Sequence, residues 1–216
     1  MLVVVGAALC GLWHRGDLLL VGIAVLAAVG WEVSCTAAEP WEGARQALPL
    51  LAFPGSLVAL IMLSGFASPV GGAVRAWAEW TKSIAGIAPT RVVMVIAVVL
   101  LQAATGNQMV RLLLKSVGAV KPTGQPQPSD RLKGGRLLGP MERLLILGLG
   151  LAGQLSVATA VIAAKSIIRF PEISAQKAKK QGGIGIDDVT EYFLIGSFAS
   201  WIVALGGLAL AATASR

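Results

Sequence analysis

The stretch RLLGPMERLLILGLGLAGQLSVATAVIAAKSIIRF, residues 136–170, is one long apolar run with charged residues at both ends and one amide, Gln154, near its middle. A helix that crosses a lipid bilayer needs about 20 consecutive apolar residues. We therefore predict a membrane-spanning helix over residues 141–170, which Pro171 ends because proline cannot continue a helix.

The rest of the chain has the same character. Of 216 residues, 56% are hydrophobic and only 13% are charged, whereas about a quarter of a soluble domain is charged. Lipid penalises buried charge, which explains the difference. We predict one membrane domain over residues 1–216. The net charge of +7 then suits anionic lipid headgroups as the partner, and we expect no nucleic-acid binding.

The apolar runs predict an all-α fold, a polytopic transmembrane helical bundle of five or six spans. A polar turn, His14 to Asp17, separates the first two runs, and the first is short enough to be half-spanning instead. We also expect a mobile linker at 121–140 and a loop at 171–187. The expected spans are residues 1–13, 18–33, 48–66, 91–118, 141–170 and 189–212.

Residues 73–86 differ from these spans. At 100° per residue, Ala73, Trp77, Trp80 and Ile84 share one face, while Arg75, Glu79 and Lys82 lie opposite. This pattern predicts an amphipathic interfacial helix, with Trp77 and Trp80 at headgroup depth. It serves either as a simple connector or as a surface for a partner.

The number of basic residues does not decide the orientation in the membrane, because six spans place nine Lys and Arg on each side. The dense charge of the linker before residue 141 favours both termini on the cytoplasmic side. We expect a multi-pass protein of a bacterial cytoplasmic, or inner, membrane.

Polar residues inside apolar runs are the candidates for function. Arg143, Gln154 and Lys165 recur every eleven residues, which places them on one face of a continuous helix. They form either a polar seam along a cavity or ordinary helix contacts. A second face of the same predicted helix carries the small residues Gly153, Ala160 and Ala164, which favour close helix packing. Gly196, Ser200 and Ala204 form a similar stripe on the last helix. The intramembrane amides are Gln102 and Asn107, and the packing residues are Gly153, Ala160, Ala164, Gly196, Ser200 and Ala204.

Catalytic patterns are weak in this sequence. There is one histidine, no G-x-S-x-G, and no cluster with zinc spacing. Asp187-Asp188-x-x-Glu191 has acids that could share a cation, but a helix cap explains it as well. We expect no metal, no cofactor and no enzymatic activity, and we expect Cys10 and Cys35 to be packing residues.

The C-terminal third, residues 139–208, resembles a family of uncharacterised bacterial integral membrane proteins. The resemblance is carried by Met141-Glu142-Arg143-Leu144-Leu145-Ile146, Gly153-Gln154, Ala163-Ala164-Lys165-Ser166-Ile167 with Arg169-Phe170, and Glu191-Tyr192-Phe193-Leu194-Ile195-Gly196 with Ser200. It implies a helical membrane protein without assigning an activity. It marks Glu142, Arg143, Gln154, Lys165, Arg169 and Glu191 as the residues to test first.

Three functions fit these patterns. The first is a non-enzymatic membrane component that packs with a protein partner or with a second copy of itself. The second is a small-solute or ion transporter or channel subunit, suggested by the intramembrane amides. The third is a metal-dependent lipid-processing enzyme built on Asp187 and Asp188.

Overall fold

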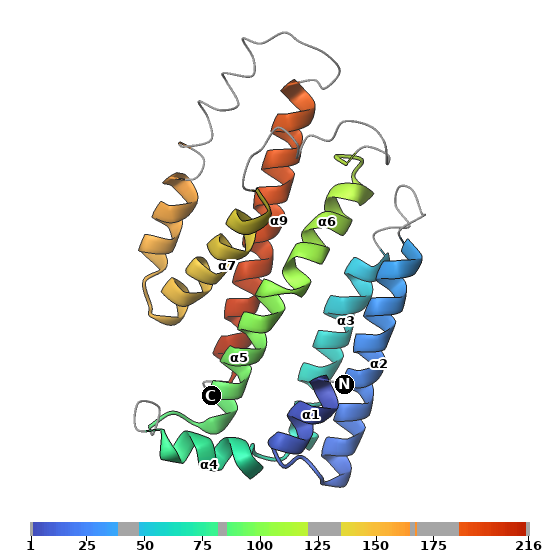
Figure 1. The fold of residues 1–216 in the computed structure, drawn as a ribbon, viewed down its shortest axis with the longest axis vertical. Coiled ribbons are helices and arrows are strands. Elements are labelled where there is room, and N and C mark those ends of the chain that lie inside the picture. The colour runs from blue at the N-terminus through green and yellow to red at the C-terminus, as the bar shows by residue number, and fades with distance from the viewer. Residues whose placement is uncertain are drawn as a thin grey trace. The chain divides into compact units, whose positions relative to one another are not determined.

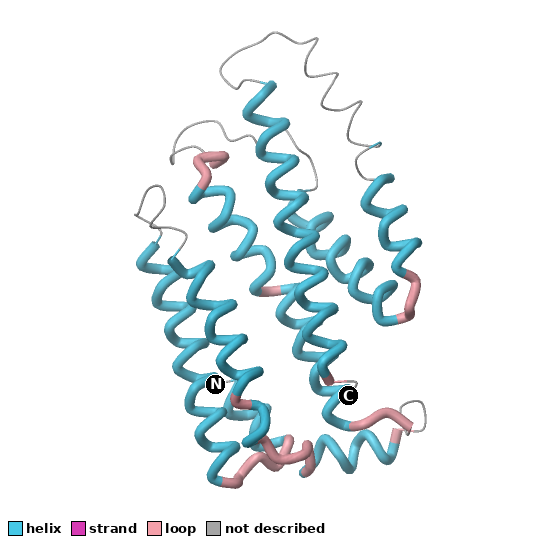
Figure 2. The backbone as a smooth tube through the Cα atoms, turned by 180° about the vertical axis from the view of Figure 1, so that it is seen from behind, coloured by secondary structure: helices cyan, strands magenta, loops and turns pink. Residues whose placement is uncertain are grey.

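The computed structural model describes residues 2–38, 48–81, 86–120, 135–164, 167 and 186–214, with the backbone alone at 37–38, 135–137 and 186–188. Every regular element in these ranges is a helix (Figure 1), and turns join them where the connections are described (Figure 2). The chain divides into two compact units, Met1–Val95 and Ile96–Arg216. The all-helical fold predicted from the sequence is therefore confirmed for the described residues.

The first unit contains α1 (Leu2–Leu9), α2 (Arg15–Ala38), α3 (Leu48–Met62), the short 3-10 helix η2 (Ser64–Phe66) and α4 (Gly72–Trp80). Helices α2 and α3 lie side by side (Figure 1). The rings of Trp31 and Phe53 contact each other between them, tilted by 53° with centroids 5.0 Å apart. Helix α4 packs on α1 and runs across the direction of α2 and α3 (Figure 1).

The second unit is built around α9 (Ile186–Thr213), which packs against α6 (Thr105–Ser116) and α7 (Gly135–Leu151). Helix α5 (Pro89–Ala103) begins in the first unit and continues into α6 after a bend of 42°. A core of Ile146, Ala158 and Ala204 joins α7, α9 and the helix Leu155–Ala164.

The run at 141–170 is not one helix, so this prediction is wrong. Helix α7 ends at Leu151, and a new helix begins at Leu155. Gly153 has a φ of +75°, and the Gln154 N–H donates to the carbonyl of Leu149 at 2.8 Å while the Gly153 N–H donates to that of Gly150 at 3.0 Å. These two bonds form a Schellman motif, a common way to end a helix with a left-handed glycine. Glycine thus stops the helix inside an apolar run.

In the described part of the chain, two helices are long and apolar enough to cross a membrane, α2 over Arg15–Thr36 and α9 over Val189–Thr213. The bent pair α5–α6 makes three if it is one span. The described residues do not support the predicted five or six spans. Helices α1, α3 and α7 have 8, 15 and 17 residues, and a span needs about 20.

Because Gly153 ends the helix in a left-handed conformation, a side chain at this position should lower the stability of the protein. Gly153→Ala forces a Cβ into the left-handed region, which costs about 1–2 kcal/mol. Gly148→Ala, in the interior of the same helix with no atom within 4 Å of the new Cβ, is the control and should be neutral or stabilising. Thermal unfolding of the purified protein measures both, and equal melting temperatures for the two variants would contradict the motif.

Candidate functional site

The most deeply buried charged side chain among the described residues is that of Arg143, which is 1% exposed. Its Nε and Nη2 donate to the backbone carbonyl of Gln102 at 3.3 and 3.2 Å. Nη2 also donates to Oδ1 of Asn107 at 2.7 Å, and Nη1 donates to Oγ of Ser200 at 3.1 Å. One guanidinium therefore ties α7 to α5, α6 and α9.

The bend between α5 and α6 supplies two of these acceptors. Carbonyl groups in the last turn of a helix have no partner further along the same helix. Gln102 lies in the last turn of α5, and its carbonyl faces the guanidinium instead. Asn107 lies in the first turn of α6, just after the bend. Gly106 lets Arg143 approach, because a Cβ there would lie 2.9 Å from Nε.

The side chain of Gln102 is fully buried and binds α9. Its Nε2 donates to the carbonyl of Val203 at 2.8 Å, which fixes which end of the amide is nitrogen. Its Oε1 is the one buried side-chain oxygen or nitrogen in the described ranges without a hydrogen-bond partner. The contact needs Gly207, because a Cβ at that position would overlap Gln102 Nε2.

The neighbouring acid, Glu142, is 8% exposed. Its Oε1 accepts a hydrogen bond of 2.8 Å from Nε1 of Trp201 on α9, and its carboxylate attracts the Arg143 charge. A buried cation is costly unless its donors are hydrogen-bonded and an opposite charge lies near, and here the guanidinium donates to three neutral acceptors while the Glu142 charge favours it. The residues Gln102, Asn107, Glu142, Arg143, Ser200 and Trp201 are called the arginine cluster below.

The two described members of the predicted polar seam, Arg143 and Gln154, do not lie along one helix. Gln154 lies in the exposed turn after α7 because the helix breaks there, so it no longer shares a face with Arg143. Lys165 and Arg169 lie outside the described residues. Glu191 itself is exposed on the first turns of α9.

The two predicted small-residue stripes differ in outcome. Gly153, Ala160 and Ala164 are exposed within the chain, and the helix Leu155–Ala164 packs through Ala158 and Ile162 instead. On α9, Ser200 and Ala204 are buried, and a Cβ at Gly196 would touch Leu114 at 3.5 Å. The buried face of α9 continues through Gly207 and Ala211.

Sequence reasoning missed Trp201 as a part of the arginine cluster, and Gly106 and Gly207 as the glycines that make room for it. Gly106 directly precedes Asn107, and Gly207 lies seven residues after Ser200, two helical turns along the same face. Extending the α9 stripe by one turn beyond Ala204 would have found Gly207. Nothing in the local sequence links Gly106 to Arg143.

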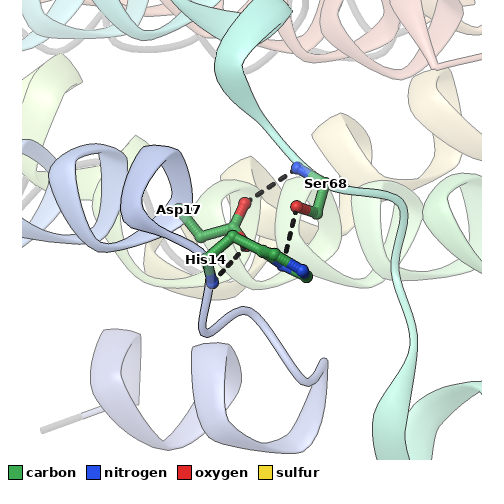
Figure 3. A network of polar contacts seen from close by, with 3 residues as sticks. All are labelled: His14, Asp17 and Ser68. Atoms are coloured by element: carbon green, nitrogen blue, oxygen red, sulfur yellow. Dashed lines mark hydrogen bonds and ion pairs between the residues drawn. The ribbon is translucent and has the colours of Figure 1, made fainter.

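A second polar cluster lies in the first unit, where His14, Asp17 and Ser68 converge (Figure 3). The buried Asp17 accepts from the Ser68 N–H at 2.8 Å and from the His14 N–H at 3.1 Å. Nδ1 of His14 lies 3.3 Å from Asp17 Oδ2 and 3.0 Å from Ser68 Oγ. A Ser-His-Asp catalytic triad uses a different ring nitrogen for each partner. This cluster uses one nitrogen for both, so it caps α2 and does not build a nucleophile.

Removal of the Asp17 carboxylate should loosen this end of the first unit. Asp17→Ala leaves the His14 and Ser68 amides without an acceptor, at a cost of about 1–3 kcal/mol. Hydrogen exchange at both amides should accelerate, as mass spectrometry of peptic fragments can show. Glu32→Ala removes an exposed acid from the same helix and should leave exchange at these amides unchanged. Unchanged exchange in Asp17→Ala would mean that the carboxylate does not hold the turn.

The helix predicted over residues 73–86 corresponds to α4, Gly72–Trp80, and it ends earlier than predicted because the backbone of Thr81 is extended. Trp77 and Trp80 are 47% and 81% exposed. Arg75 pairs with Glu79 at 2.9 Å, and this hydrogen bond raises the pKa of the Arg75 guanidinium above its ordinary value. The two cysteines, Cys10 and Cys35, are both buried, and burial raises the pKa of the Cys10 thiol.

The described residues contain no group of three His, Cys, Asp or Glu side chains that could hold a metal ion. The side chains of Asp187 and Asp188 lie outside the described part. Comparison with protein-family models, curated proteins and solved structures found no match to this chain.

Proposed function

We propose that the protein is a non-enzymatic integral component of a bacterial cytoplasmic membrane that packs with a protein partner or with a second copy of itself. One observation carries this proposal. The polar side chains of Gln102, Arg143 and Ser200 form hydrogen bonds between helices, so they serve to join helices. Arg143, Gln102 and Ser200 are each 3% exposed or less, and their hydrogen bonds described above reach other helices.

The direct test is native mass spectrometry of the full chain released from lipid nanodiscs. We expect a complex with a second copy or with one co-purifying protein at fixed stoichiometry. A chain that is released alone from every lipid composition tested would overturn the proposal. Lipid adducts without a protein partner would also count against it.

A transporter or channel subunit is the second candidate, and two observations favour it. Helix α5–α6 is bent by 42° directly after a buried amide, and discontinuous helices often carry substrate sites in transporters. In addition, Gln102 Oε1 has no partner, so an acceptor is available inside the helix bundle.

Cysteine accessibility separates the two candidates. Asn107→Cys and Ser200→Cys are made in a background where Cys10 and Cys35 are replaced by alanine. A packed core predicts no reaction of either new thiol with a membrane-impermeant methanethiosulfonate, whereas a water-filled pathway predicts reaction of both. An exposed position on α6, Arg111→Cys, shows whether the reagent reaches that helix.

A further inference from the structure

Four exposed aromatic residues lie in three segments of the first unit. Trp13 precedes α2, Phe66 ends η2, and Trp77 and Trp80 lie on α4. They are 65%, 66%, 47% and 81% exposed. These four residues are called the aromatic end below. Single exposed aromatic residues scattered over a surface need no explanation. These four, however, lie either in residues 9–17 or in segments that contact this part of the chain.

The contacts that hold them converge on residues 9–17. Phe66 lies against the start of α2, because a Cβ on Gly16 would overlap the Phe66 carbonyl oxygen. Ser68, two residues later, donates its N–H to Asp17 at 2.8 Å, as Figure 3 shows. Trp13 directly precedes His14, whose N–H donates to the same carboxylate at 3.1 Å.

Helix α4 is attached to the same region. The Gly71 N–H donates to the Cys10 carbonyl at 2.9 Å. A Cβ on Gly72 would lie 2.7 Å from the Leu9 carbonyl oxygen, so the two backbones touch here. Because α4 begins at this contact and crosses the direction of α2 (Figure 1), its tryptophans belong to the same end of the unit.

This end is also where the candidate span of α2 begins. The span runs over Arg15–Thr36, about 33 Å of helix, which matches a hydrocarbon core of about 30 Å. His14 and Arg15 are exposed and need water or headgroups, whereas Leu18 and Leu19, on the next turn, are exposed and need hydrocarbon. A change from polar to apolar surface within one turn is expected at a membrane–water boundary.

We propose that the aromatic end is a phospholipid-binding surface at this boundary, with α4 lying in the plane of the bilayer. Tryptophan prefers the glycerol and carbonyl layer because its ring is apolar and its N–H is polar. The Arg75–Glu79 pair, with side chains 65% and 64% exposed, remains in the headgroup and water layer. The inference goes beyond the proposed function and needs only that α2 crosses the membrane. It holds whether the protein is a packing component or a transporter.

The test measures the depth of single tryptophans in phospholipid vesicles. The chain has six tryptophans, and full-length variants keep only Trp77, only Trp80 or only Trp201, with the others replaced by phenylalanine. Vesicles carry a nitroxide quencher either at the headgroup or near the end of the acyl chain. We expect the headgroup probe to quench Trp77 and Trp80 at least about twofold more than the deep probe does, as for interfacial tryptophans.

Trp201 is the matched control, because it lies near the middle of the α9 span, Val189–Thr213, and should show the opposite order. Circular dichroism confirms that each variant keeps its helix content. If a variant loses helix, Trp77→Phe and Trp80→Phe are measured singly in the otherwise native chain. Each should then reduce the fraction of tryptophan fluorescence that the headgroup probe quenches. Equal quenching by both probes, or none by either, would overturn the proposal and place this surface against water or protein.

Discussion

Replacing Arg143 by methionine should lower the free energy of unfolding by about 2–4 kcal/mol, the largest effect expected for a single polar substitution in the second unit. Methionine fills a similar volume, so the loss measures hydrogen bonds and not a cavity. The Gln102 carbonyl, Asn107 Oδ1 and Ser200 Oγ all lose their donor. Each unpaired buried acceptor costs about 1–3 kcal/mol, although helix contacts in membranes are often nearer about 0.6 kcal/mol.

Unfolding of the purified protein in mixed micelles by increasing denaturing detergent measures this difference. Arg143→Lys should recover only part of it, because a single ammonium cannot span acceptors on three helices as the planar guanidinium does. Arg111→Ala removes an exposed arginine from α6 and should change stability by less than about 0.5 kcal/mol. If Arg143→Met were as stable as the native chain, the arginine cluster would not hold the second unit together.

Gly207→Ala should destabilise the protein while Gly206→Ala, one residue earlier on the same helix, should not. A Cβ at Gly207 overlaps Gln102 Nε2 and lies 2.9 Å from Val98 Cγ1, whereas a Cβ at Gly206 has no atom within 4 Å. Overpacking costs about 1–3 kcal/mol, and alanine gains up to about 1 kcal/mol over glycine in an open helix position. The two variants should therefore differ by about 1–4 kcal/mol.

A double mutant identifies the cause of the Gly207 effect. Shortening the facing side chain in Gln102→Ala makes room for the new methyl group, so Gly207→Ala should cost less in that background than alone. The difference is the coupling energy between the two positions, measured by the same unfolding experiment. A coupling energy near zero would show that α5 and α9 do not meet through these residues.

The helix break at Gly153 has a local signal in the sequence, the glycine itself, but the long apolar run around it favoured one continuous helix. The Gly153-Gln154 pair is a common helix ending, yet it lies inside an apolar run long enough for a span. Apolar periodicity cannot separate one long helix from two short ones joined by a tight turn. The backbone hydrogen bonds to Leu149 and Gly150 decide between them.

For the arginine cluster, the sequence pointed to several of the residues but not to the contacts between them. The sequence identified Gln102, Asn107, Arg143 and Ser200 separately, because each is a polar residue or small stripe residue in an apolar setting. It placed Arg143 with Gln154 and Lys165, since residues on one helix face are the only neighbours that periodicity can predict. The actual partners lie 36 to 57 residues away in the chain.

The sequence by itself determined that the described parts of the chain are helical, that the last helix contains an apolar run of spanning length, and that the segment of α4 has an aromatic face. These are properties of local composition, and lipid permits few structures for such segments. Only the tertiary structure decided where the helices end and which polar groups meet. A buried arginine must find acceptors, and the bend after Gln102 and the close approach at Gly207 bring them within reach.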